Sequence, residues 1–126
     1  MKTEKELNKI TEKIIGCAIE IHRELGPGLL ESIYESALCI EFDSIGLGYE
    51  RQKSLPVIYK NKSLGNFRVD LVVDGSVALE LKSVERYDPI FEAQLLSYMK
   101  LGKYKLGLLI NFNSRLLKNG IKRFIL

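Results

Sequence analysis

Apolar residues near the N-terminus recur at three- and four-residue steps, which predicts an amphipathic helix over residues 5–25. Thr3 followed by Glu6 matches a capping box at its start. The triplet Gly26-Pro27-Gly28 ends this helix. The same period continues over residues 29–45 and stops before Gly46 and Gly48, so we predict a second helix there. Its predicted buried stripe comprises Leu30, Ile33, Tyr34, Ala37, Leu38 and Ile45.

After Gly48 the pattern changes to short apolar runs. Residues 49–60 predict one or two strands, and Pro56 favours an edge position. Residues 64–73 and 76–84 predict a hairpin joined at Asp74-Gly75. Asp88 as cap and Pro89 as first residue predict a third helix, which runs to about Leu101.

Two further strands are predicted near the C-terminus. The run over residues 104–112 is almost continuously apolar, as in a strand buried on both faces, and residues 121–126 complete the sheet. The order of two helices, strands, one helix and two strands predicts a mixed sheet flanked by helices, an α/β or α+β architecture. A chain of 126 residues suits a single domain over residues 1–126.

Composition and charge indicate the class of protein, its cellular compartment and its kind of partner. The apolar share of 46% and the charged share of 28% are typical of a soluble globular protein. Asp and Glu are absent after Glu92 while basic residues continue, which favours a side that faces nucleic acid. Cys17 and Cys39 lack paired spacing and predict buried free thiols. Without an apolar signal core or a membrane-length run, we expect a cytoplasmic protein.

Asp70, Glu80 and Lys82 are charged residues among the most apolar positions of the hairpin, where a buried charge is costly. Glu80 and Lys82 are two apart, so on a strand they share one face at about 6.5–7 Å. A solvated polar face of an antiparallel sheet would explain them equally well if this stretch stood alone.

The three residues suit phosphodiester hydrolysis, which needs a positioned water and positive charge beside the phosphate. Mg²⁺ is held by one or two carboxylates and keeps several waters. Asp70 and Glu80 are candidate ligands, and the main-chain carbonyl of Leu81 could add another. Lys82 could orient or deprotonate the attacking water.

Asp70 followed by Glu80-Leu81-Lys82 resembles the signature of the PD-(D/E)XK nuclease superfamily. The stretch from Gly28 through Glu31 to Tyr34 matches the name-giving motif of the GxxExxY family, a small branch of that superfamily. The segment from Gln94 to Tyr98 resembles the QxxxY motif of its exonuclease-like members, and the late run GLLINF is also similar.

This resemblance implies a restriction-endonuclease-like fold and a nuclease that uses Mg²⁺ or Mn²⁺, with nucleic acid, most simply DNA, as substrate. It further implies a role for each matching residue. The metal ligands would be Asp70 and Glu80, with Glu31 on the metal directly or through water, and Lys82 would be the catalytic lysine. Gln94 and Tyr98 would line the site and contact DNA or the lysine side.

Other functions remain open at this stage. A nucleic-acid-binding or assembly module could retain the fold without turnover, although such a module has no need of Lys82 beside two carboxylates. A paired-carboxylate glycosidase is disfavoured by the lysine and by the absence of Trp. Since cutting both strands of a duplex is easiest with two sites, we expect a homodimer.

The hairpin register decides whether this site can form. A two-residue Asp74-Gly75 loop would place Asp70 and Glu80 on opposite faces. The nuclease hypothesis therefore requires an odd loop or a bulge. We predict a three-residue loop of residues 73–75 with Gly75 in the left-handed region, which places Asp70 opposite Ala78 and on the face of Glu80.

Overall fold

The computed structural model describes all residues, 1–126. The helices are α1 (Glu4–Leu25), α2 (Glu31–Ser44) and α3 (Ile90–Gly102), and a short 3₁₀ helix, η1, spans Leu117–Gly120. The strands are β1 (Tyr49–Tyr59), β2 (Lys62–Val73), β3 (Val77–Lys82), β4 (Leu106–Asn111) and β5 (Ile121–Ile125). None of the helices combines the length and apolar composition that crossing a membrane requires.

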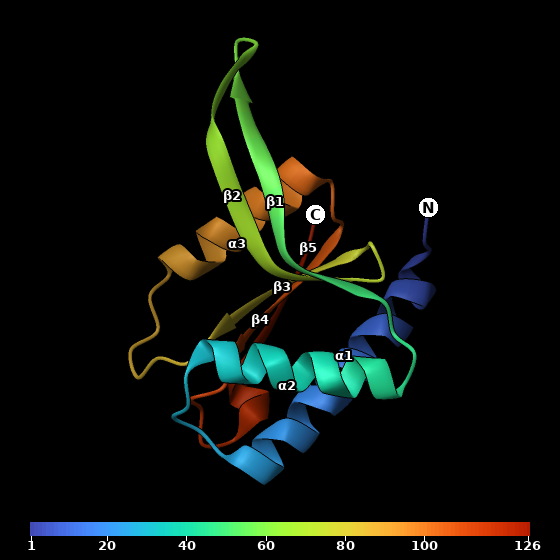
Figure 1. Cartoon of the computed structure of the whole chain (residues 1–126), viewed down its shortest axis with the longest axis vertical. Coiled ribbons are helices and arrows are strands. Elements are labelled where there is room, and N and C mark those ends of the chain that lie inside the picture. The colour runs from blue at the N-terminus through green and yellow to red at the C-terminus, as the bar shows by residue number, and fades with distance from the viewer.

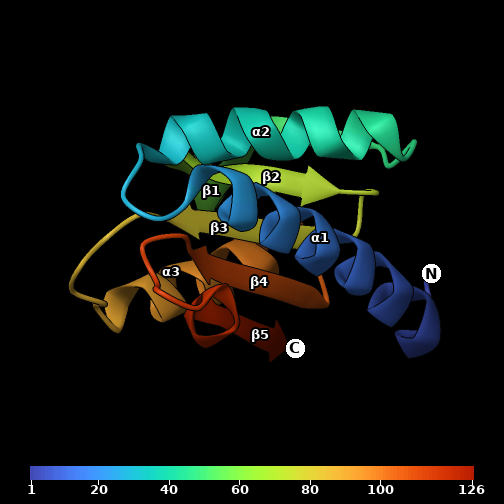
Figure 2. The same cartoon turned by 90° about the horizontal axis from the view of Figure 1, so that it is seen from below.

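The five strands form one mixed sheet in the order β1-β2-β3-β4-β5. Only β3 and β4 run parallel, and α3 is the crossover between them. Helices α1 and α2 cover one face of the sheet and α3 the other (Figures 1 and 2). This is an α+β, restriction-endonuclease-like arrangement, which confirms the predicted fold class, and β1 lies at an edge as Pro56 indicated.

Side chains alternate between the two faces of the central strands, so the sheet has one apolar core beneath α1 and α2 and another beneath α3. In β3, Leu79 and Leu81 pack in the core beneath α1 and α2, whereas Ala78 packs with Leu95 and Met99 of α3. All six residues of β4 are buried, as the continuous apolar run predicted. Glu80 is the one acidic side chain buried within β3, because it lies on the α3 face among apolar neighbours.

The predicted helix boundaries hold to within a few residues. Thr3 and Glu6 form the expected capping box at α1. The second helix begins at Glu31 rather than at residue 29, and its Leu30 and Ile33 are 73% and 47% exposed instead of buried. The N-cap of α3 is Pro89 and not Asp88, although the Asp88 side chain accepts the N–H of Ile90, the first residue of the helix.

Three smaller expectations need correction. Pro89 precedes α3 instead of opening it. Both cysteines are free as predicted, but Cys17 is only half-buried. Tyr34 and Leu38 of α2 are buried as its apolar pattern predicted, but Glu35, Cys39 and Phe42 are buried beside them.

The β2–β3 loop has three residues, the odd number that we predicted, but it lies one residue later in the chain. Val73 pairs with Val77 and Leu71 with Leu79, so the loop comprises residues 74–76 instead of 73–75. Asp74 and Gly75 both have positive φ, 52° and 63°, which gives the tight turn closed by the bond from Ser76 N to Val73 O. With this register Asp70 falls opposite Glu80 and not opposite Ala78.

Strands β1 and β2 leave the sheet together as a long two-stranded ribbon (Figure 1). The ribbon bends at Gln52, whose φ of 50° lies in the left-handed region and which drops out of the β1–β2 pairing opposite Asp70. Val69 and Val72 are three apart, yet both pack against the α3 side because the bend lies between them. Asp70 therefore sits where the ribbon separates from the body.

Candidate active site

Asp70 and Glu80 face each other at the point where β2 and β3 diverge. The backbone pairing of β2 with β3 ends at Leu71 and Leu79. Beyond this pair, hydrogen bonds from main-chain N–H groups to side-chain carboxylates join the two strands. The N–H of Asp70 donates to Oε1 of Glu80 at 3.2 Å, and the N–H of Leu81 donates to Oδ2 of Asp70 at 2.8 Å. Each carboxylate thus satisfies a main-chain donor that the splayed strands leave without a ladder partner.

The charged forms of both carboxyl groups are destabilised, chiefly by burial. Burial raises the pKa of Glu80 to about 8, and the charges of Asp70 and Glu31 add to the effect. Burial also raises the pKa of Asp70, against the bonds from Leu81 and Gln52. A buried and a half-buried carboxyl group side by side, both with raised pKa values, mark a site that holds a proton or a cation.

Lys82 lies two residues beyond Glu80 at the end of β3. It forms no ion pair with either carboxylate, but its charge lowers the pKa of both Asp70 and Glu80. The Lys82 ammonium lies 4.4 Å from the ring centroid of Phe91 on α3, a cation–π contact. The structure thus brings Lys82 to the α3 side of the two carboxylates.

Tyr98 of α3 lies on the same side of the site. Its ring packs 5.3 Å from that of Phe67 on β2. Burial and then the charges of Glu80 and Asp70 raise the pKa of the Tyr98 phenol, so it stays neutral. Gln94, one turn earlier on α3, is exposed and makes no hydrogen bond to another residue.

Glu31 approaches from the start of α2. Its Oε2 accepts the N–H of Ser83, the residue after Lys82, at 3.3 Å. The Ser83 hydroxyl donates to the carbonyl of Leu29 at 2.5 Å, so the loop before α2 is tied to the end of β3. Glu31 and Asp70 line one cavity of about 240 Å³ that reaches Leu81.

Tyr34 of α2 anchors the loop that precedes this helix. The Tyr34 hydroxyl donates to the carbonyl of Gly26 at 2.5 Å and accepts the N–H of Leu29 at 3.1 Å. Its ring stacks on Phe112, with centroids 4.2 Å apart. Gly28 has φ of 94°, which a residue with a side chain rarely adopts. Gly28 and Tyr34 thus shape the loop that presents Glu31.

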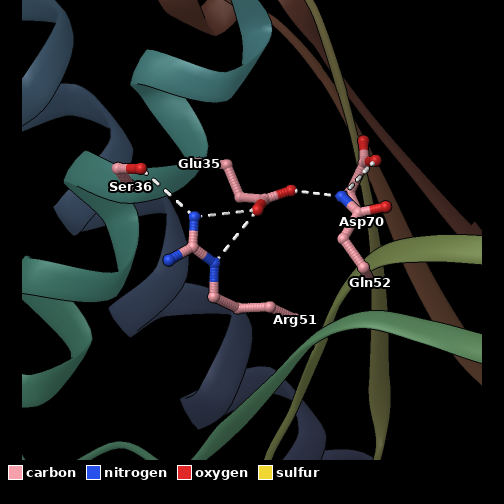
Figure 3. A network of polar contacts seen from close by, with 5 residues as sticks. All are labelled: Glu35, Ser36, Arg51, Gln52 and Asp70. Atoms are coloured by element: carbon pink, nitrogen blue, oxygen red, sulfur yellow. Dashed lines mark hydrogen bonds and ion pairs between the residues drawn. The ribbon is translucent and has the colours of Figure 1, made fainter.

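Sequence reasoning missed a second polar layer behind Asp70, drawn in Figure 3. The Gln52 amide donates to Oε1 of Glu35 at 2.6 Å and lies 3.4 Å from Oδ1 of Asp70. Arg51 donates to the other Glu35 oxygen at 3.0 Å and to the Ser36 hydroxyl at 3.1 Å. Glu35 carried one signal, its place one turn after Glu31, whereas Gln52 carried none.

These residues fit a hard divalent cation. Asp70 and Glu80 supply two carboxylates. The backbone of Leu81 faces β2, because its N–H donates to Asp70 and the next carbonyl, that of Lys82, accepts from Phe112, the residue after β4. This oxygen-rich set suits Mg²⁺ or Mn²⁺, which complete their coordination with water. No three His, Cys, Asp or Glu side chains gather to hold a metal, so Glu31 does not form a three-carboxylate cluster with Asp70 and Glu80.

Comparison with known proteins identifies the family of the chain. The model of the PD-(D/E)XK nuclease superfamily matches residues 8–124, nearly the whole chain and all of the residues described above. No curated protein and no solved structure matches the chain. On the extent of that match, the chain belongs to the PD-(D/E)XK nuclease superfamily.

Proposed function

We propose that the protein is a metal-dependent nuclease that hydrolyses phosphodiester bonds in DNA, with Mg²⁺ or Mn²⁺ as cofactor. One observation carries this proposal: Asp70 and Glu80 lie opposite each other at the split between β2 and β3, with Lys82 two residues along. A binding module would gain nothing from two adjacent carboxyl groups, the half-buried Asp70 and the buried Glu80, whose pKa values are both raised.

Each residue has a distinct task in this proposal. The bound cation would supply positive charge beside the scissile phosphate and lower the pKa of the attacking water. Asp70 and Glu80 would hold that cation, with the Leu81 carbonyl as a further ligand and Glu31 acting through water. Lys82 would hold the attacking water in line with the phosphorus and offset charge as the P–O bond to the leaving group breaks.

Tyr98 and Gln94 would contact the substrate from α3. The case is stronger for Tyr98, because its neutral phenol lies on the side of α3 that faces the site, near both carboxylates. Gln94 is exposed one turn away and is free to meet a strand of DNA.

We also place the chain in the GxxExxY branch of the superfamily. Gly28, Glu31 and Tyr34 carry the motif, and their separate tasks support it: a left-handed turn, a carboxylate beside the site, and a ring that anchors the loop. A Glu31→Gln variant tests the motif, since metal-dependent activity should fall while the loop stays ordered.

The alternative is a nucleic-acid-binding or assembly module that has lost turnover. Incubation with Mg²⁺ or Mn²⁺ and a panel of labelled duplex, branched and single-stranded DNA and RNA separates the two. A nuclease gives metal-dependent products that a chelator abolishes. Binding without products under every metal and substrate would favour the alternative.

A homodimer completes the proposal, because two sites cut the two strands of a duplex most easily. Exposed apolar residues on α2, such as Leu30, Ile33 and Ile40, offer area for such contact. Light scattering at working concentration should give twice the chain mass of 14.4 kDa. A monomer mass would remove the dimer from this proposal without affecting the nuclease itself.

A further inference from the structure

The β1–β2 ribbon carries charge that the site does not use. Between Glu50 and Asp70 the chain has no Asp or Glu but has five basic residues: Arg51, Lys53, Lys60, Lys62 and Arg68. Arg51 pairs with Glu35 and Lys53 with Glu50. The other three form no ion pair, and all three are exposed. The outer ribbon is therefore a one-sign surface without a partner in the protein.

The tip of the ribbon also exposes apolar side chains. Ile58, Tyr59 and Leu64 are 57%, 60% and 65% exposed. The strands meet in a two-residue loop, Lys60-Asn61, in which both residues have positive φ. Nearer the site Phe67 packs against Tyr98, so the base of the ribbon is fixed while the tip projects past α3 (Figure 1).

We propose that this ribbon is a DNA-binding arm that enters the major groove of a B-form duplex and positions the backbone at Asp70. The inference rests on the proposed nuclease function and names its substrate class as duplex DNA. The major groove, about 12 Å wide, admits a two-stranded ribbon. Lysines at the tip meet phosphates, and exposed apolar residues meet base edges such as the thymine methyl group.

The position of the ribbon gives it a role in catalysis. Lys62 precedes Asp70 by eight residues on the same strand, about 27 Å at 3.4 Å per residue. That reach is shorter than one turn of B-DNA, about 34 Å. Contact at the tip and chemistry at the base of β2 can therefore occur on one turn of the same duplex.

The groove requirement separates duplex DNA from other nucleic acids. A-form RNA has a deep, narrow major groove that side chains cannot read, and single strands have no groove. The protein should therefore bind a B-form DNA duplex more tightly than a double-stranded RNA or a single strand of equal length. Equal affinity for all three would overturn the proposal, because charge alone would then explain binding.

Removing the tip charges tests the arm directly. The double variant Lys60→Asn with Lys62→Gln is neutral at both positions, and Asn tolerates the left-handed conformation of Lys60. The matched control, Lys9→Gln with Lys13→Gln, removes the same charge from exposed positions on α1. Circular dichroism confirms that both variants are folded.

Fluorescence anisotropy with a labelled DNA duplex in chelator, from 50 to 200 mM salt, is the readout. Loss of two phosphate contacts should reduce the log–log salt slope by about 1.8, and a slope change of that size alters affinity about tenfold over this range. The control should keep the wild-type slope. The proposal of a DNA-binding arm would be overturned if the tip variant kept the wild-type slope or if the control changed by the same amount. It would also be overturned if the tip variant changed its oligomeric mass and that change accounted for the loss of binding.

Failure of the arm and failure of the nuclease are distinguishable. Metal-dependent cleavage of a duplex by the wild-type chain, read as products on a gel, reports the nuclease function. Cleavage with unchanged binding of the tip variant would refute the arm and leave the nuclease standing. Absence of cleavage with the expected loss of binding would refute the nuclease and support the ribbon as a duplex-binding arm.

Discussion

The N–H of Asp70 donates to Oε1 of Glu80 at 3.2 Å, across the first step of the hairpin that lacks backbone pairing. The strands splay here because β2 bends away with β1 at Gln52. The two carboxylates occupy the resulting gap and close the open end of the ladder with their side chains. One backbone feature, the bend, thus creates both the site and the projecting ribbon.

Metal binding should depend on Asp70. At a metal concentration ten times the dissociation constant, a cation bound only to the native state stabilises it by about 1.4 kcal/mol. We expect Mg²⁺ or Mn²⁺ to raise the melting temperature of the wild-type protein, and Asp70→Asn to remove most of that shift. Differential scanning fluorimetry with and without metal measures it.

The matched control is Asp74→Asn, an exposed position in the turn of the same hairpin. Its metal response should equal that of the wild type. If Asp70→Asn kept the full response, or if both variants lost it, Asp70 would not be a metal ligand.

Stability in chelator should fall as pH rises from about 5 to about 8. The pKa of Glu80 is about 8 in the folded protein and near 4.5 when unfolded, so the native state binds more protons than the unfolded chain between these values. The free energy of unfolding then decreases with pH, by on the order of a few kcal/mol. Urea denaturation at several pH values measures this slope.

Glu80→Gln is the diagnostic variant for that pH dependence. It removes the titrating group and should flatten the slope between pH 5 and 8. A wild-type protein equally stable at both ends of this range would show that Glu80 does not retain its proton as proposed.

Gln52 should act on the reaction through Asp70. Gln52→Gly removes the amide that lies against Asp70 and Glu35 but keeps the left-handed backbone, so the bend survives. Loss of a residue that orients a metal ligand lowers activity or metal affinity about 10–100-fold. Steady-state cleavage kinetics with metal titration should show a drop of this size.

A second glycine substitution separates this effect from backbone loosening. Asp74→Gly replaces another left-handed residue of the chain, with φ of 52°, away from the site. It should retain wild-type kinetics. Wild-type activity of Gln52→Gly would mean that the polar layer behind Asp70 is structural only.

Tyr34 should contribute stability through its hydroxyl. Tyr34→Phe keeps the stacking on Phe112 but leaves the Gly26 carbonyl and the Leu29 N–H without their partner. We expect a loss of about 1–3 kcal/mol in the free energy of unfolding. Tyr59→Phe, at an exposed position, should stay within about 0.5 kcal/mol. Equal small effects of both changes on urea denaturation would refute the anchoring role.

Local patterns predicted much of this architecture. The α1 period, the capping box and the continuous apolar run of β4 are short-range signals, and each predicted its element. The requirement that Asp70 and Glu80 share a face predicted an odd loop, because strand faces alternate residue by residue. The loop lies one residue later than predicted, since turn chemistry at Asp74-Gly75 is compatible with both positions.

Long-range relationships were beyond such patterns. Gln52 joins Glu35 to Asp70 only after three elements have packed, so nothing in the sequence marked Gln52, and the spacing from Glu31 was the one signal for Glu35. The buried face of α2 was predicted only in part, because apolar residues lie on more than one side of the helix: Tyr34 and Leu38 are buried, whereas Ile33 is exposed. Burial of a polar residue such as Glu35 depends on its partner Arg51, which the sequence of the helix does not contain.

Metal-dependent cleavage by the wild-type chain and by Lys82→Ala tests the central claim most directly. With Mg²⁺ or Mn²⁺ and end-labelled duplex DNA, the wild type and an exposed-lysine control, Lys9→Ala, should give products that a chelator abolishes. Lys82→Ala should lose at least about 100-fold of that rate, the scale of positioned proton transfer and charge stabilisation. Equal cleavage by wild type and Lys82→Ala, or no metal-dependent cleavage by any of the three, would contradict the nuclease assignment.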